Sequence, residues 1–111
     1  MSWLDAQKTC LQQWRVLLEP RSQQKFDDAF AFKDLVATEI WLGASDLAEE
    51  GKFVWASDCE EVGDDNPFWL AGEPNDAGNR EDCLALANWA IGMVDLPCDG
   101  DHMHAFVCDA Q

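Results

Sequence analysis

Apolar residues near the start of the chain recur at helical spacing. Trp3, Ala6, Cys10 and Trp14 are three or four residues apart, a repeat that places side chains on one face of an α-helix. Ser2 precedes this run and can cap the helix, because its hydroxyl oxygen can accept a hydrogen bond from a backbone amide of the first turn. The pattern therefore predicts a first helix with Cys10 on its buried face.

A second helical pattern follows Pro20, which interrupts the chain. Ser22 can cap this helix, and Phe26, Ala29 and Phe30 share one of its faces, while charged residues lie elsewhere. A helix with this distribution has one face suited to burial. We therefore predict a second helix that packs on the core.

Short apolar runs later in the chain predict strands. Residues 40–42 form such a run, which ends at Gly43, and residues 52–55 form a second one after the turn at Glu50-Gly51. Two more strand-like runs cover residues 83–87 and 105–108. Two helices followed by several short strands predict a small domain that contains both element types.

A long loop region, which begins with the polar residues 56–66 and extends to about residue 78, separates these strands. Segments longer than about 12–15 residues without regular structure are usually functional or disordered in compact domains. Within this stretch and just after it, four carboxylates and one amide lie within ten residues: Glu73, Asn75, Asp76, Glu81, Asp82. Such a region is either a solvated acidic surface or a site for a hard cation, because Ca²⁺ binds about six to eight oxygen ligands.

Composition limits the protein to a few classes. The 111 residues suffice for one domain with a modest core. The formal net charge of −15 repels nucleic acid and anionic membranes, and no run of about eighteen apolar residues encodes a membrane span. The start lacks a basic segment followed by an apolar one, so we expect that any secretion signal was removed or omitted.

The sequence offers little for catalysis. No carboxylate pair lies in an apolar surrounding that would raise a pKa for acid–base chemistry, and no nucleophile motif or phosphate-binding loop occurs. His102 and His104 could face one side of an extended segment and hold a transition metal, but two histidines without a third ligand are more often surface residues. We therefore expect a binding protein and not an enzyme.

Five cysteines occur without a Cys-x-x-Cys pair, which favours disulfides over a zinc site. Disulfides persist in oxidising compartments, so we expect a secreted, extracellular protein. The odd count leaves one cysteine, which is either a free thiol or a bridge to another chain.

Several short segments together resemble a C-type lectin-like domain in their order and approximate spacing. These segments are Trp41-Leu42-Gly43, residues 50–55, residues 69–75, Glu81-Asp82-Cys83, Leu96-Pro97-Cys98 and Phe106-Val107-Cys108. The resemblance covers nearly the whole chain. It implies one α+β domain over residues 1–111, with two helices, small antiparallel sheets and a long calcium-held loop.

The triplet Glu73-Pro74-Asn75 is the mark of the mannose-type sugar site in this family, whereas Gln-Pro-Asp marks the galactose type. The resemblance also implies two disulfides, Cys10 with Cys108 and Cys83 with Cys98. Cys59 is then the odd cysteine, either a protected thiol or the link in a disulfide-linked dimer. In the family a strand usually precedes the first helix, so either this sequence is trimmed or the domain closes differently.

By the same resemblance, Ca²⁺ would bind at two sites. The first would take its ligands from a turn between two strands and from the long loop: Asp46, Glu50, Asp76, Glu81, Asp82. The second would bind calcium and a sugar together, through Glu73, Asn75, Glu81 and Asp95. For the first set, the alternative is that the two turn residues only decorate an exposed turn.

One position departs from the family pattern. The family's Trp-Asn-Asp triplet is Met93-Val94-Asp95 here, so Val94 supplies neither a metal-binding oxygen nor an amide that donates to a sugar hydroxyl. We therefore expect weakened sugar binding. Two functions follow: a secreted calcium-dependent lectin that binds mannose-type glycans, or a protein-interaction module that keeps structural calcium and has impaired sugar binding.

Overall fold

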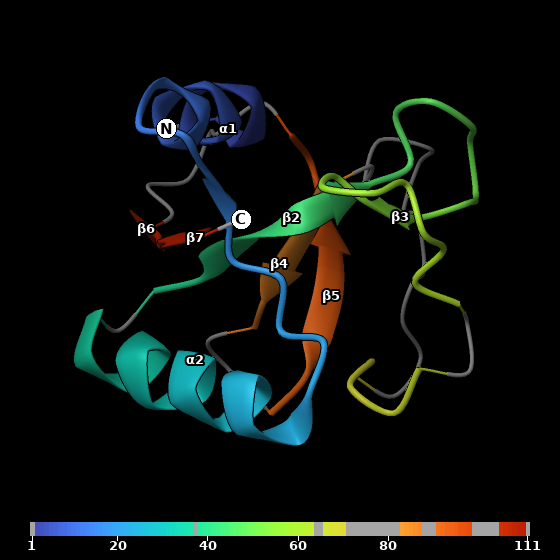
Figure 1. Ribbon diagram of the computed structural model, residues 1–111. Coiled ribbons are helices and arrows are strands. Elements are labelled where there is room, and N and C mark those ends of the chain that lie inside the picture. The colour runs from blue at the N-terminus through green and yellow to red at the C-terminus, as the bar shows by residue number, and fades with distance from the viewer. Residues whose placement is uncertain are drawn as a thin grey trace.

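A computed structural model shows two helices packed around short strands (Figure 1). The residues that it describes are 2–36, 38–63, 66–70, 83–87, 91–98 and 105–110. The helices are α1 (Trp3–Gln12) and α2 (Gln23–Val36). The strands are β1 (Arg15–Leu17), β2 (Ile40–Ser45), β3 (Val54–Trp55), β4 (Cys83–Leu86), β5 (Met93–Leu96), β6 (Ala105–Phe106) and β7 (Cys108–Ala110).

Strand β2 is the centre of the larger sheet. It pairs antiparallel with β3 and β4, and β4 pairs antiparallel with β5. Strand β6 joins β2 in the parallel direction, and a separate two-stranded sheet pairs β1 with β7. The predicted α+β fold with two helices and small antiparallel sheets is therefore confirmed, with one parallel pair added.

Helix α1 begins where the sequence predicts. Ser2 Oγ accepts a hydrogen bond from the Asp5 backbone N–H at 3.1 Å, and Trp3 is buried. The prediction for Trp14 is wrong, because the helix ends at Gln12 and the Trp14 side chain is 89% exposed. Trp14 has a φ of 58° and turns the chain into β1, a strand that the apolar pattern did not predict.

Helix α2 buries the predicted face. Ser22 Oγ accepts a hydrogen bond from the Lys25 backbone N–H at 3.2 Å, and Phe26 and Ala29 are buried. The Phe26 ring also stacks on Phe68, with ring centroids 4.4 Å apart. This contact packs α2 against the segment that leads to the acidic loop, residues 71–82.

Gly43 lies inside β2 and does not end the strand, so that sequence prediction is wrong. A Cβ atom at this position would lie 2.8 Å from the backbone oxygen of Leu17 and 3.0 Å from Cγ of Glu19. Glycine is therefore required by the close approach of the chain that leaves β1. The predicted strand at residues 52–55 is also shorter, since only β3 is regular there.

The predicted C-terminal strand divides into β6 and β7. The carbonyl oxygen of Val107, between the two strands, accepts a hydrogen bond from the Leu18 backbone N–H at 2.9 Å. The chain changes partners at this point, because β6 pairs with β2 whereas β7 pairs with β1. Residues of one apolar run in the sequence therefore belong to two different sheets.

The larger sheet is buried on both faces. Ile40, Leu42 and Ala44 of β2 belong to the apolar cluster that includes residues of α2, whereas Trp41 belongs to the cluster that includes residues of α1. This alternation follows from the two-residue repeat of a strand. The structure thus places Trp41 in the core.

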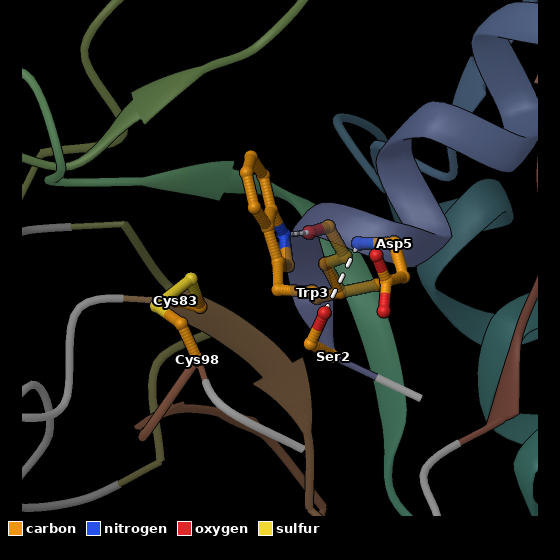
Figure 2. Close-up of a disulfide and its surroundings, with 6 residues drawn as sticks. Ser2, Trp3, Asp5, Cys83 and Cys98 are labelled. Atoms are coloured by element: carbon orange, nitrogen blue, oxygen red, sulfur yellow. Dashed lines mark hydrogen bonds between the residues drawn. A yellow bond between two sulfur atoms is a disulfide. The ribbon is translucent and has the colours of Figure 1, made fainter.

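The two disulfides have the pairing that the family resemblance implies. Cys10–Cys108 connects α1 to β7, and Cys83–Cys98 connects the start of β4 to the residues after β5. Figure 2 shows the second bridge close to the start of α1. There the Trp3 backbone N–H donates to the Cys98 carbonyl oxygen at 3.0 Å, which ties α1 to this disulfide.

Candidate metal and ligand site

Asp46 immediately follows β2 and is only 2% exposed. Its Oδ2 accepts a hydrogen bond from the Gly51 backbone N–H at 2.8 Å, which closes the turn that carries Glu50. Gly51 has a φ of 84°, a conformation that favours glycine. The two predicted ligands of this turn differ in exposure, because Asp46 is buried whereas Glu50 is exposed.

Asp95 is a second buried carboxylate of the predicted set, with 1% exposure. The sheet register relates it to Asp46, because Cys83 at the start of β4 pairs both with Ser45 of β2 and with Leu96 of β5. Asp46 directly follows Ser45, and Asp95 directly precedes Leu96. Both carboxylates therefore come from the end of the sheet where β4 begins.

The other predicted ligands lie outside the described residues: Glu73, Asn75, Asp76, Glu81, Asp82. The same holds for His102 and His104. Within the described part of the chain, no three His, Cys, Asp or Glu side chains gather into a group that could hold a metal ion. The two calcium sites therefore stay predictions.

The chain is firmly attached on both sides of residues 71–82. Leu70 donates its backbone N–H to the Met93 carbonyl oxygen at 2.9 Å, and Met93 donates to the Phe68 carbonyl oxygen at 2.7 Å. Cys83 is fixed by its disulfide. Because β4 and β5 are antiparallel, Leu70 and Cys83 are held at opposite ends of this strand pair.

Val94 occupies the position that the family pattern gives to asparagine. It pairs with Ala85 in the β4–β5 register and is 1% exposed. An asparagine here would have its amide inside the protein, where an amide needs hydrogen-bond or metal partners. The apolar Val94 needs none, which is consistent with a site that lacks one ligand.

Sequence reasoning missed a buried carboxylate at Glu19. Its Oε1 accepts a hydrogen bond from the Ser57 hydroxyl at 2.7 Å, and its Oε2 accepts one from the Ser57 backbone N–H at 3.0 Å. The two residues are 38 positions apart, so no local pattern could have predicted the contact. Glu19 fixes the turn that follows β3 to the chain that follows β1.

The same turn is held by Arg21 and carries the odd cysteine. Arg21 pairs with Asp58 at 2.9 Å and with Glu60 at 2.5 Å, on either side of Cys59. A hydrogen bond from the Glu60 backbone N–H, and then the Arg21 guanidinium, hold the pKa of Asp58 below its ordinary value. Cys59 is exposed, has a φ of 60° and carries a free thiol.

This turn corrects one detail of the predicted long loop. Its first part has regular backbone bonds, because Trp55 donates to the Glu60 carbonyl oxygen at 2.9 Å and Val62 donates to the Phe53 carbonyl oxygen at 2.9 Å. Val54 also forms an isolated antiparallel bridge with Glu61. Residues 56–62 therefore form a turn held by backbone hydrogen bonds and are not a structureless segment.

Comparisons with known proteins agree on one family. Residues 1–110 match the family model described as the Lectin C-type domain. The low affinity immunoglobulin epsilon Fc receptor of Mus musculus is 37% identical over 107 residues, which are 96% of this chain and 30% of the receptor. Salivary C-type lectin 1 of Aedes albopictus is 35% identical over 91 residues, which are 77% of this chain and 58% of that protein.

A solved structure supports the same fold. The carbohydrate-recognition domain of cow CD23, crystallised in the presence of a GlcNAc2Man3 oligosaccharide, has a TM-score of 0.78 and 31% identity, covering 97% of this chain and 78% of that one. The chain spans less than two thirds of the two curated relatives given above. No helix in the described part of the chain is long and apolar enough to cross a membrane.

Proposed function

Because this chain belongs to the C-type lectin domain family, we propose that it is a secreted, calcium-dependent lectin of mannose-type specificity. The observation that carries the proposal is the burial of Asp46 and Asp95 at one end of the sheet. At that end the chain enters β4 directly after the acidic pair Glu81-Asp82 in the sequence.

The oxygens of an ionised carboxylate accept hydrogen bonds but donate none, and hard cations prefer such oxygens as ligands. Ca²⁺ also tolerates the irregular ligand geometry of a loop. Asp46 therefore fits a calcium site whose other ligands would be Glu50, Asp76, Glu81 and Asp82. A cation there would tie the acidic loop to the end of β2.

Asp95 fits the second site, with ligands Glu73, Asn75 and Glu81. When bound, calcium would supply a cation to which neighbouring sugar hydroxyls can add their oxygens. The carboxylate of Glu73 would accept a hydrogen bond from one hydroxyl, and the amide of Asn75 would donate one to the next. Bonds to a charged partner are stronger than neutral ones, so these residues would orient the sugar.

Mannose-type specificity rests on Glu73-Pro74-Asn75, which matches the family's mannose triplet. Val94 removes one donor and one oxygen from this constellation, so the affinity for a single sugar should be low. Two disulfides and the salivary origin in the name of one relative favour an extracellular location.

Chromatography tests this function. The protein should be retained on immobilised mannose in Ca²⁺ and released by a chelator, and it should pass through immobilised galactose. Retention that survives chelation, or equal retention on both sugars, would exclude the proposed mechanism. A Glu73→Ala variant that is still retained would also exclude it, since that carboxylate is placed at the sugar.

A second candidate is a protein-interaction module with structural calcium. It is favoured by Val94, which weakens the sugar site, and by the exposed thiol of Cys59, which is available for a link to a partner. The name of the mouse relative describes a receptor for an immunoglobulin segment, which is a protein ligand. A dimer on non-reducing electrophoresis that disappears in Cys59→Ser would support this candidate, whereas a monomer whose native thiol resists labelling would exclude the link.

A further inference from the structure

A cavity of about 430 Å³ lies between α2 and the C-terminal strands. Figure 1 shows α2 along the lower left, with β6 and β7 above it. The cavity wall is mainly apolar: Leu18, Ala29, Phe32, Phe106, Val107. This volume is within the range of small-molecule sites, about 300–1,000 Å³. The predicted calcium ligands that the structure describes, Asp46, Glu50 and Asp95, are not among its lining residues.

Three charged residues also line the cavity. Lys25 Nζ lies 2.6 Å from Asp109 Oδ2, so the positive charge of Lys25 is matched by Asp109. Asp28 adds a further negative charge, and its Oδ1 accepts a hydrogen bond from Gln24 Nε2 at 2.9 Å. Among the lining residues that the structure describes, one lysine and two aspartates give a net formal charge of −1. An apolar lining with a net negative charge is complementary to a molecule with an apolar body and a positive group.

We propose that this cavity binds a small amphipathic organic cation, such as an arylalkyl amine. The apolar body would lie against Ala29 and Val107, where it leaves water. The ammonium group would pair with the Asp28 carboxylate, and the aromatic rings of Phe32 and Phe106 belong to the same lining and are of a kind that attracts cations. The formal charge of −15 on the whole chain also raises the local concentration of cations around the protein.

Three probes with one apolar body test the proposal: 3-phenylpropylammonium, 3-phenylpropanol and 3-phenylpropanoate. Each is titrated into isotopically labelled protein in excess Ca²⁺, which competes for the carboxylates of the acidic loop. The cation should bind most tightly and the anion least, with amide shifts concentrated at residues 25–32 and 106–109. Equal affinities for the three probes, no binding of the cation, or shifts confined to other residues would each overturn the proposal.

The helix provides a matched pair of variants. Asp27 and Asp28 are adjacent, exposed, and hydrogen-bonded to Gln23 and Gln24 by the same i, i+4 arrangement, but only Asp28 lines the cavity. Asp28→Asn should weaken binding of the ammonium probe by about two- to fivefold, the range of an exposed ion pair. It should leave the alcohol unaffected. Asp27→Asn, which removes the same charge, should change neither, and an equal loss in both variants would reduce the effect to net charge and overturn the site.

Discussion

The carboxylate of Asp46 and the backbone N–H of Gly51 form a 2.8 Å hydrogen bond that closes the turn after β2. The bond fixes the direction of a side chain that is almost fully buried. A carboxylate has about four acceptor positions, so the bond from Gly51 does not occupy them all. The turn thus fixes the carboxylate that we propose as a calcium ligand.

Replacement of Asp46 by asparagine should lower the stabilisation that calcium gives. The asparagine oxygen can still accept from Gly51, so the turn should persist, but the site loses one negative charge. Each tenfold loss of affinity removes about 1.4 kcal/mol of calcium-dependent stability. Thermal unfolding in Ca²⁺ and in chelator measures this difference.

The control for that variant is Glu49→Gln. Glu49 is an exposed carboxylate of the same turn, and its Oε2 lies 3.8 Å from Lys52 Nζ. It is not in the predicted ligand set, so calcium should stabilise this variant as much as the original protein. An unchanged calcium effect in Asp46→Asn would remove Asp46 from the site.

The two disulfides should contribute unequally to stability. Cys10–Cys108 spans 98 residues of sequence, whereas Cys83–Cys98 spans 15. In the chain-entropy model these loops correspond to about 4.7 and about 3 kcal/mol. Denaturant unfolding of the two double alanine variants should therefore show the larger loss without Cys10–Cys108. A larger loss from removing the shorter loop would mean that chain entropy does not dominate.

The pKa of Asp58 should rise when Arg21 is replaced by glutamine. The Glu60 backbone N–H is the largest cause of the lowered pKa of Asp58 and the Arg21 guanidinium is the next, so the variant keeps the first and loses the second. Carboxyl chemical shifts followed through a pH titration measure the change. An unchanged value would show that water screens the Arg21–Asp58 pair completely.

The lowered pKa also gives a direction for stability against pH. A folded pKa below the unfolded value means that Asp58 stabilises the fold above the unfolded pKa of about 3.9. This contribution is lost as pH falls through the lower folded pKa. Asp58→Asn should therefore destabilise the protein at neutral pH and lose its effect in strong acid, which unfolding at a series of pH values would show.

Exchange of the mannose triplet for the galactose triplet should change sugar preference. Glu73→Gln together with Asn75→Asp keeps the size of both side chains and reverses which one carries the charge. Retention should move from the mannose matrix to the galactose matrix. If the double variant keeps its preference for mannose, these two residues do not determine specificity.

Local patterns predicted the parts of the fold that local forces determine. The cap at Ser2 and the buried face of α2 follow from side chains within a few residues of each other. Predictions were wrong where distant segments meet. The first helix ends before Trp14, where the chain turns into β1, the partner of β7, and Gly43 lies inside a strand at a point where the chain after β1 approaches too closely for a side chain.

The candidate site divides in the same way. The family resemblance indicated Asp46 and Asp95, but only the sheet register shows that both come from the end where β4 begins. Glu19 and its contact with Ser57 had no signal in the sequence, since a buried carboxylate looks like any surface glutamate until its partner is known. The cavity beside α2 could not be predicted from local patterns, because it forms where this helix packs against strands much later in the sequence.

Calorimetric titration of mannose into the original protein and Val94→Asn, each in Ca²⁺ and in chelator, measures calcium-dependent sugar binding itself. We expect weak binding by the original protein in Ca²⁺, tighter binding by Val94→Asn, and no binding by either in chelator. The restored amide supplies the missing oxygen and donor at a buried position where a cation would satisfy it. Absence of binding by both proteins in Ca²⁺ would contradict the lectin function, as would binding that persists in chelator.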